Sequence, residues 1–240
     1  MSGKYKTGSG GYTWSVFADA LAAVEERIAR AAARAGRARD SIQLIAVTKT
    51  FPPEVIEAAY AAGLRHFGEN YVQEFEAKRP LLGPMAGAHY HLIGHLQSNK
   101  TRRAAELFQT IHTIDDIKLV RRLDETRARL DVLVEVKLSD EESKHGAPPE
   151  QLPDILERIL QSSHLRLVGL MTIPPWSDDP EASRPYFARL RELAERHRPA
   201  NQPALGLSMG MSNDFEVAIE EGATHIRIGT ALFGRRAMKR

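Results

Sequence analysis

The sequence has no cysteine among its 240 residues. Disulfides, thiolate metal sites, iron–sulfur clusters and a cysteine nucleophile are therefore excluded by composition alone. An excess of charge of one sign is also missing, because 33 Lys and Arg residues stand against 31 Asp and Glu residues and leave a formal net charge of +2. The basic residues are interspersed with acidic ones, so the sequence indicates no general affinity for nucleic acid or for an anionic membrane.

Long hydrophobic runs are absent as well. No segment reaches the roughly 18 apolar residues that a membrane span needs, and the most apolar helical stretch, residues 17–35, is interrupted by several charged side chains. Residues 1–12 are rich in Gly, Ser and Lys and lack the apolar centre of a signal peptide. We therefore expect a disordered extension over residues 1–13, a single domain over residues 14–240, and a cytoplasmic location.

The rest of the chain shows a regular alternation of two patterns. Apolar residues recur with helical periodicity between residues 15 and 35, and Gly36 ends this first segment. Eight short apolar runs then alternate with amphipathic segments. The runs lie at residues 42–48, 65–68, 90–94, 110–114, 131–136, 165–171, 205–208 and 225–229. The amphipathic segments lie at residues 53–62, 71–78, 99–106, 116–130, 149–161, 180–196 and 212–221.

Eight strands separated by helices favour a parallel sheet, because the connections are too long for hairpins and suit right-handed crossovers. The natural closure is a single (β/α)8 TIM barrel with an extra N-terminal helix. The first strand, in the segment IQLIAVT, is apolar on both faces, as expected for a strand that lies between the barrel interior and the helices. A doubly wound sheet is the alternative, but the first strand is not followed by the G-x-G-x-x-G turn of a dinucleotide-binding fold.

The ligand site of such a barrel is built at the carboxyl ends of the strands. Lys49 follows the first run and, by alternation, lies on the same side as Ile45 and Val47. A lysine amine beside apolar walls is partly desolvated, so its pKa falls and the neutral amine can form a Schiff base with an aldehyde. The alternative interpretation is a solvated lysine on a surface loop.

Two later loops combine glycine with hydroxyl groups. Ser208, Gly210 and Ser212 follow the seventh run, and Gly229 and Thr230 follow the eighth. Glycine lets the backbone approach a ligand closely, while hydroxyl and free backbone N–H groups bind phosphate. Phosphate sites of TIM barrels often lie after strands seven and eight. The alternative is that these residues only form turns and helix caps.

A histidine-rich segment, HYHLIGH, raises a metal hypothesis. His89 and His91 have the spacing that puts two imidazoles on one side of a strand, and His95 follows them. A barrel metallohydrolase also needs inward ligands from later strands. Those strands end instead in residues that are not typical metal ligands: Lys137, Met171, Ser208 and Arg227.

The first helical segment and the residues after it carry an arginine-rich face. Its members are Arg27, Arg30, Arg34, Arg37 and Arg39. Glu25, Glu26 and Asp40 lie alongside these arginines, which favours a solvated helix face over a nucleic-acid site.

Taken together, several segments resemble a known family. AVTKTFPPEVIEAAYAAGLRHFGENYVQEF, HLIGHLQSNK, EESKHG, GLMTIPP, LSMGMSNDFEVAI and RIGTALFG are similar, in this order, to the pyridoxal phosphate homeostasis protein family. The resemblance runs from about residue 18 to residue 236. It implies a fold like the N-terminal barrel domain of alanine racemase and of bacterial-type ornithine decarboxylase, without their second β domain.

The resemblance also implies a cofactor, pyridoxal 5′-phosphate, and a role for each matched residue. Lys49 would hold it as an internal aldimine. The residues expected to contact the phosphate or to shape its loop are Ser208, Met209, Gly210, Ser212, Gly229 and Thr230. The residues expected at the ring are Asn70, His91 and Arg227. The sequence departs from the family at Lys137, where asparagine is usual, and this offers a second amine to the aldehyde.

Two functions remain open at this point. The family resemblance implies a carrier that buffers the free cofactor and passes it to apo-enzymes, without significant catalysis. Arg227 near the pyridine nitrogen would discourage ring protonation and weaken the electron sink on which catalysis depends. The alternative is a small pyridoxal phosphate-dependent racemase or lyase. We expect a monomer that binds neither nucleic acid nor membrane.

Overall fold

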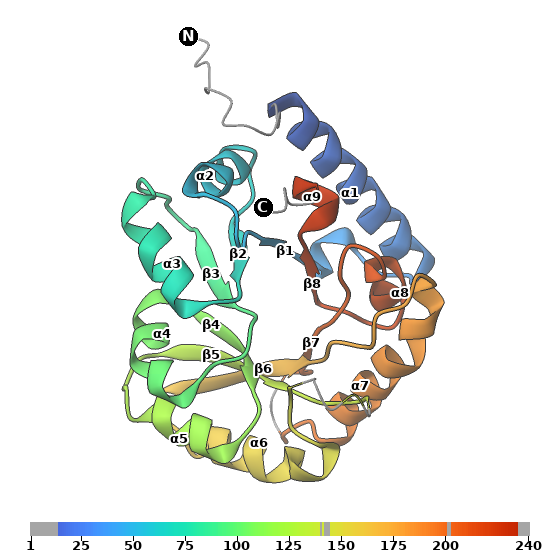
Figure 1. The fold of residues 1–240 in the computed structure, drawn as a ribbon. Coiled ribbons are helices and arrows are strands. Elements are labelled where there is room, and N and C mark those ends of the chain that lie inside the picture. Colours follow the sequence, from blue (N-terminus) through green and yellow to red (C-terminus); the bar gives the residue numbers. More distant parts are fainter. Residues whose placement is uncertain (1–13, 140, 142–144, 201–202, 235–240) are drawn as a thin grey trace.

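The computed structural model describes residues 14–139, 141, 145–200 and 203–234. The predicted disordered extension over residues 1–13 lies outside the described residues, as do three residues of the EESKHG segment. In the described part of the chain, eight parallel strands pair in chain order and close into a barrel (Figure 1). The strands are β1 (Gln43–Val47), β2 (His66–Glu69), β3 (His89–Leu92), β4 (Thr110–Ile114), β5 (Leu130–Glu135), β6 (Leu165–Met171), β7 (Gly206–Ser208) and β8 (His225–Ile228).

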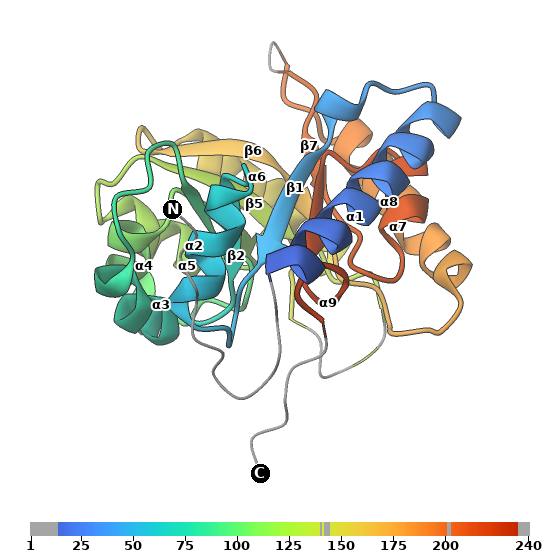
Figure 2. The ribbon, with the colours of Figure 1, turned by 90° about the horizontal axis from the view of Figure 1, so that it is seen from above.

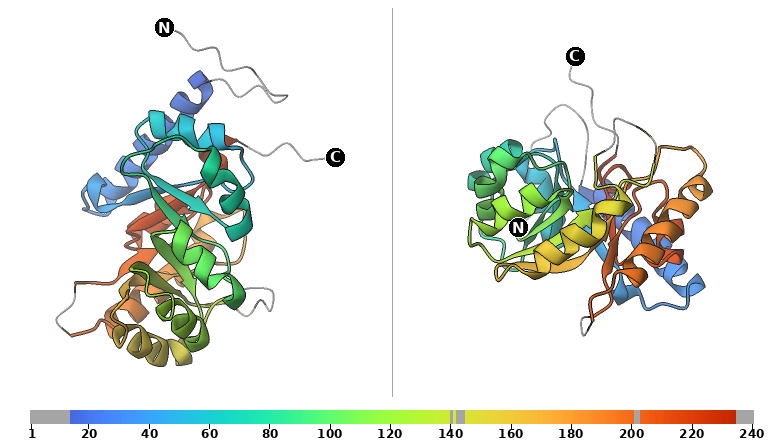
Figure 3. Two further views of the ribbon diagram at one scale, coloured as in Figure 1. Left: turned by 90° about the vertical axis from the view of Figure 1, so that its left-hand side faces the viewer. Right: turned by 90° about the horizontal axis from the view of Figure 1, so that it is seen from below.

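Helices surround this barrel on the outside. They are α1 (Trp14–Arg34), α2 (Pro53–Ala61), α3 (Val72–Lys78), α4 (Thr101–Leu107), α5 (Ile117–Asp124), α6 (Leu152–Leu160), α7 (Arg184–Arg196), α8 (Phe215–Glu220) and α9 (Thr230–Phe233). The extra N-terminal helix α1 packs against α8 and α9, as Figure 2 shows from above. Figure 3 shows the helices from α2 (cyan) to α6 (yellow) following one another along one side of the barrel. None of the helices in the described ranges combines the length and apolarity needed to cross a bilayer.

The register confirms the predicted barrel. Ala46 of β1 pairs with Phe67 of β2 on one side and with Ile228 of β8 on the other, which closes the sheet. The largest difference from the sequence pattern lies at the helix predicted over residues 116–130, because α5 ends six residues earlier, at Asp124. Arg127 adopts a positive φ of 59°, a conformation that an α-helix does not contain. The chain therefore turns there and enters β5.

An apolar shell fills the space between the strands and the helices. Phe75 of α3 is fully buried, and its ring lies 4.7 Å from that of Tyr90 and 5.1 Å from that of Phe108. Phe67, Phe187 and Phe215 are also completely buried. Burial of one such side chain stabilises the fold by about 1.5–3 kcal/mol. The helices are therefore held to the barrel mainly by hydrophobic packing.

The interior of the barrel is different, because much of it is polar. His112 of β4 and Ser208 of β7 lie on strands that are not neighbours, yet their side chains are 2.9 Å apart. Such a contact crosses the barrel interior. The expectation of strands that are apolar on both faces is confirmed for β1, where Ile45 and Ala46 are fully buried. β4, β7 and β8 differ from β1, because their inner faces carry histidine, serine and arginine.

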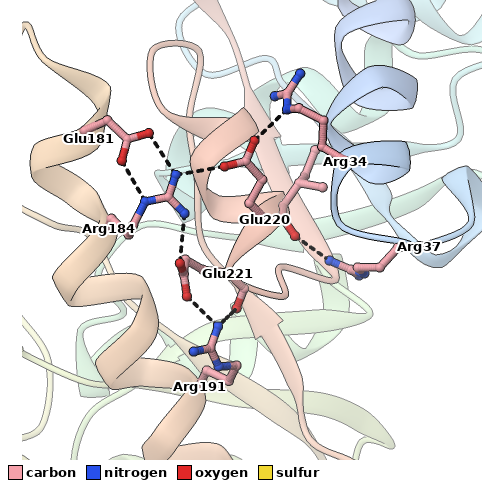
Figure 4. A network of polar contacts seen from close by, with 8 residues as sticks. Arg34, Arg37, Glu181, Arg184, Arg191, Glu220 and Glu221 are labelled. Atoms are coloured by element: carbon pink, nitrogen blue, oxygen red, sulfur yellow. Dashed lines mark hydrogen bonds and ion pairs between the residues drawn. The ribbon is translucent and has the colours of Figure 1, made fainter.

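A network of ion pairs joins α7, α8 and α1 on the outside of the barrel (Figure 4). Arg184 at the start of α7 donates to three carboxylates, those of Glu181, Glu220 and Glu221. Glu220 also accepts from Arg34 of α1 at 2.8 Å. The sequence pattern indicated that the arginine-bearing face of α1 is solvated. In the structure this face lies partly against α8.

Candidate functional site

The structure brings the end of β1 together with the loops that follow β7 and β8. Gly229 follows β8 beside Val47, whose Cβ lies 3.4 Å from the position of a Cβ added at Gly229. The backbone N–H of Arg227 donates to the carbonyl of Gly210 at 3.0 Å. Lys49 comes two residues after Val47. The predicted amine and the two predicted phosphate loops thus share one rim of the barrel.

Lys49 is partly buried in a turn that a buried ion pair supports. Glu69 at the end of β2 is fully buried and accepts from the Thr48 hydroxyl at 2.8 Å and from the Lys78 ammonium at 3.0 Å. Lys78 also donates to the Thr48 carbonyl at 3.0 Å. Burial raises the pKa of Glu69, whereas the contacts with Lys78 and Thr48 lower it. The backbone immediately before Lys49 is therefore fixed by buried charge-assisted hydrogen bonds.

The backbone immediately after Lys49 is fixed as well. Thr50 has a positive φ of 65°, which is strained for a β-branched residue. Its N–H donates to the carboxylate of Glu74 on α3 at 2.5 Å, and the same carboxylate pairs with Lys78. The ion pair and Glu74 together hold Lys49 between two anchored neighbours.

The loop after β7 needs glycine at one position. Gly210 has a φ of 90°, and a Cβ added there would lie 2.5 Å from the Cβ of Ala218 on α8. Asp214 then fixes the rest of the loop, because its carboxylate accepts from the N–H of Met211 at 2.7 Å. The backbone of Gly210 therefore packs directly on α8, with no side chain between them.

The two predicted phosphate loops are tied to each other. The Ser212 hydroxyl accepts from the N–H of Ala231 in the first turn of α9, at 3.1 Å. Gly229 and Thr230 are the residues immediately before and at the start of that short helix. Met209 is fully buried beneath the loop, and its N–H donates to the carbonyl of His225 at 3.1 Å. Hydroxyl groups and glycine backbone thus converge where the sequence predicts phosphate binding.

Arg227 is a buried cation below this rim. Its guanidinium donates to the Ser208 hydroxyl at 2.7 Å and to the Thr172 carbonyl at 3.0 Å. Burial lowers the pKa of Arg227 to about 10, against the opposing effect of the Glu135 and Asp214 carboxylates. The group therefore remains charged at neutral pH.

A chain of histidines continues from Ser208 through the barrel interior. The Ser208 hydroxyl contacts Nδ1 of His112, Nε2 of His112 contacts Nδ1 of His91, and Nε2 of His91 contacts Nδ1 of His66, each at 2.9 Å. Burial lowers the pKa of all three imidazoles, to about 4 for His66 and well below the ordinary value for the other two. The rings are therefore neutral. Because each ring-to-ring contact needs one donor and one acceptor, their tautomers are coupled.

The metal hypothesis built on His89 and His91 loses its geometric basis. His89 is hydrogen-bonded to the Thr110 hydroxyl at 2.7 Å, and both ring nitrogens of His91 are engaged in the histidine chain. Of this segment, His95 alone joins a group of potential metal ligands within the described residues, and that group contains neither His89 nor His91.

Asn70 is the clearest indication of a missing polar partner. Its side-chain oxygen is buried and has no hydrogen-bond partner among the described residues. An unsatisfied buried amide costs about 1–3 kcal/mol, and a polar ligand at this rim removes that cost. Lys137, the second lysine of the mouth, follows β5 and is also partly buried.

Sequence reasoning missed the residues that support the site from below. Glu69 and Lys78 are nine positions apart on different elements, and no local spacing rule connects them. His112 carried a usable signal, because alternation with Thr110 in the TIHTI strand places both side chains on one face. The same alternation in β8 places the side chains of His225 and Arg227 on one face of that strand.

Comparison with known proteins agrees with this arrangement. The family model for the N-terminal domain of alanine racemase matches residues 20–237. The pyridoxal phosphate homeostasis protein of Aquifex aeolicus is 46% identical over 221 residues, which cover 90% of this chain and 96% of that protein. The chain belongs to the pyridoxal phosphate homeostasis protein family. The Escherichia coli member is 42% identical, over 90% of this chain and 95% of its own length.

Solved structures extend the similarity to three dimensions. PipY of Synechococcus elongatus, in the structure described as having PLP bound, is 39% identical with a TM-score of 0.80 and covers 91% of this chain and 100% of that one. The structure of PipY without PLP gives a TM-score of 0.82. Alanine racemase from Corynebacterium glutamicum shares the fold, with 18% identity, a TM-score of 0.68 and coverage of 93% of this chain and 64% of that one. The resemblance and fold expected from the sequence are confirmed.

Proposed function

We propose that this chain binds pyridoxal 5′-phosphate through a Schiff base on Lys49 and takes part in intracellular vitamin B6 homeostasis. The observation that carries the proposal is the anchored turn of Lys49, which lies on the same barrel rim as two hydroxyl- and glycine-bearing loops. A family member of known structure holds this cofactor. We assign the binding to a single domain, residues 14–240.

The phosphate is assigned to the two tied loops. Ser212 accepts from a backbone N–H with its hydroxyl oxygen, so its proton is left to donate to an anion. The backbone around Gly210 and Gly229 and the hydroxyl of Thr230 supply further donors. Met209 packs beneath and shapes the loop.

The family resemblance places Ser208 at the phosphate, but this proposal gives it no direct contact with the cofactor. Its hydroxyl is buried and already contacts both Arg227 and His112. We therefore assign Ser208 to orienting Arg227, and Arg227 to the pyridine side of the cofactor. His91 extends the same support through His112, and the unsatisfied amide of Asn70 offers the ring a polar contact.

The same geometry favours a carrier over an enzyme. Bound pyridoxal phosphate supplies an aldehyde and an electron-accepting ring. Arg227 remains a cation at neutral pH, and a guanidinium gives up its proton far less readily than a carboxylic acid does. It therefore does not protonate a ring nitrogen, which limits catalysis. We propose that the protein is a cytoplasmic monomer that buffers the cofactor, passes it to apo-enzymes, and binds neither nucleic acid nor membrane.

A transfer experiment separates carrier from enzyme. The loaded protein is mixed with an apo-aminotransferase, and recovered aminotransferase activity is followed beside the racemisation of free amino acids. We expect transfer without racemisation, loss of loading in Lys49→Ala, and full loading in the matched control Lys137→Ala. Racemisation that rises with protein concentration and disappears in Lys49→Ala would instead establish the enzyme.

A further inference from the structure

Three potential metal ligands meet at a part of the rim that the cofactor proposal does not use. His95 follows β3, Asp115 follows β4 and His145 lies in the connection after β5. Their ligand atoms all lie within 4.8 Å of one another, and they form the one such group found in the described part of the chain. Three successive strands of the barrel each contribute one ligand.

The distances are close to those of a coordination sphere. Nδ1 of His95 lies 3.5 Å from the Asp115 carboxylate, and the imidazoles of His95 and His145 stack with centroids 3.9 Å apart. In a tetrahedral site with metal–ligand bonds of about 2.0–2.2 Å, neighbouring ligand atoms are about 3.4 Å apart. One pair already has this separation. The remaining adjustment is a shift of roughly 1 Å together with a rotation of the exposed His145 ring, because the stacked rings hold their nitrogen lone pairs in nearly parallel planes.

The backbone holds these loops in place without help from a ligand. The Thr113 hydroxyl donates to the carbonyl of Gly94, next to His95, at 2.8 Å. On the other side, Ala147 donates its N–H to the carbonyl of Glu135 at 2.8 Å. Gly146, between His145 and this anchor, has a φ of 116° and leaves no room for a Cβ, which would lie 2.9 Å from a backbone nitrogen. The backbone next to His95 and His145 is thus held in place, and only side-chain movement is left for binding.

The charges also fit a cation. The Asp115 side chain is only 16% exposed, and burial raises its pKa while the two facing imidazoles oppose that effect. The neighbouring Asp116 adds negative charge, but its carboxylate is committed to the N–H of Leu119 at the start of α5. A partly buried carboxylate facing two nitrogen donors is the donor set of a transition-metal site.

We propose that His95, Asp115 and His145 bind one divalent transition-metal ion of the Zn²⁺, Co²⁺ or Ni²⁺ class. Two imidazoles and one carboxylate suit these ions better than Mg²⁺ or Ca²⁺, which prefer oxygen ligands. Three protein ligands leave a further coordination position for water or an anionic oxygen. None of these three residues is assigned to the cofactor in the proposed function.

The test is a titration of the full-length protein with Co²⁺, whose visible d–d absorption reports nitrogen and oxygen coordination. We expect one Co²⁺ per chain and displacement of the band by Zn²⁺. Loss of a group that only hydrogen-bonds to a metal ligand often weakens metal binding 10–100-fold. His145→Ala and Asp115→Asn remove the ligands themselves, so each should raise the Kd for Co²⁺ by roughly 100-fold or more. His95→Gln removes a ligand by a different change, and circular dichroism checks the fold of each variant.

A second histidine–aspartate pair in the chain serves as a control, because it tests whether any histidine beside an aspartate binds Co²⁺. His164 lies 3.1 Å from the Asp124 carboxylate, but Arg158 and Ser162 occupy the same carboxylate where the proposed site has a second imidazole. His164→Ala should therefore leave Co²⁺ binding unchanged. Absence of binding below millimolar Co²⁺, or binding that folded His145→Ala and Asp115→Asn retain, would overturn the proposal.

Discussion

The inside of the barrel and the shell around it differ in the polarity of their side chains. The shell packs aromatic and aliphatic side chains such as Phe75, Phe108 and Phe187 between the sheet and the helices. The interior carries a polar chain that runs from His66 to Arg227. Apolar packing is strong and tolerant, whereas a buried polar network is costly unless every member is satisfied. The difference indicates that the shell maintains the fold and the interior supports the site.

The largest expected effect comes from the shell. Phe75→Ala removes a fully buried ring between α3 and the barrel, and we expect a loss of about 3–5 kcal/mol in the free energy of unfolding. Urea denaturation measures it. The exposed Leu81 provides the control, because Leu81→Ala should change stability by less than about 0.5 kcal/mol. If Phe75→Ala also weakened cofactor binding by the folded protein, the separation of the two regions would be wrong.

The second effect lies at the junction of the two regions. Lys78→Met leaves Glu69 as a buried, uncompensated charge, and we expect a loss of roughly 3 kcal/mol together with slower attachment of the cofactor. The double variant Lys78→Met/Glu69→Gln removes that charge. It should recover much of the stability but not the attachment rate, because the Thr48 carbonyl and the Glu74 carboxylate both lose their contact with Lys78. Recovery of both properties would show that the ion pair does not position Lys49.

The interior should also be the source of acid sensitivity. Burial lowers the pKa of His66 and His225 to about 4 in the folded protein, below the value of about 6.5 in an unfolded chain. The unfolded state therefore binds protons first as the pH falls. Stability should be constant above about pH 6.5 and fall toward pH 4, by up to about 1.4 kcal/mol per pH unit for each histidine.

Urea denaturation between pH 4 and pH 8 measures this slope. His225→Gln should reduce it by about one proton's contribution, since glutamine does not titrate. His197→Gln, at the end of α7 and outside the barrel interior, should leave the slope as it is. Equal slopes in all three proteins would contradict the assignment of acid sensitivity to the interior.

The smallest expected effect belongs to the outer surface of the shell. Arg184→Gln disrupts the network in Figure 4, and we expect a loss of about 1 kcal/mol or less at low salt. The loss should shrink at 1 M salt, where the screening length falls to about 3 Å. Cofactor loading should not change. A loss that persists at high salt would indicate packing by the arginine stem.

The barrel could be predicted from the sequence because each strand and helix has its own local pattern of apolar residues. Apolar runs bounded by turns, such as residues 42–48, mark strands whatever their distant partners are. The end of α5 could not be predicted in the same way, because the apolar pattern continues beyond Asp124 while the positive φ of Arg127 depends on where β5 begins.

The site likewise contains residues that local sequence patterns predict and residues that only the three-dimensional fold brings together. Residues at strand ends, such as Lys49 and Gly229, could be assigned to one rim because a barrel places all carboxyl ends together. The contact between His112 and Ser208 joins two strands that are not neighbours, 96 positions apart, and depends on the barrel's diameter. The group of His95, Asp115 and His145 likewise depends on how three separate loops fold over the rim.

The central claim, that Lys49 is the cofactor's attachment point, is tested most directly by borohydride reduction and peptide mapping. The protein is loaded with pyridoxal phosphate, reduced, digested and analysed by mass spectrometry, with Lys49→Ala and Lys137→Ala treated in parallel. The account predicts a stable pyridoxyl label on the peptide that contains Lys49, retained in Lys137→Ala and absent from Lys49→Ala. A label on Lys137 in the unaltered protein, or no label at all, would contradict it.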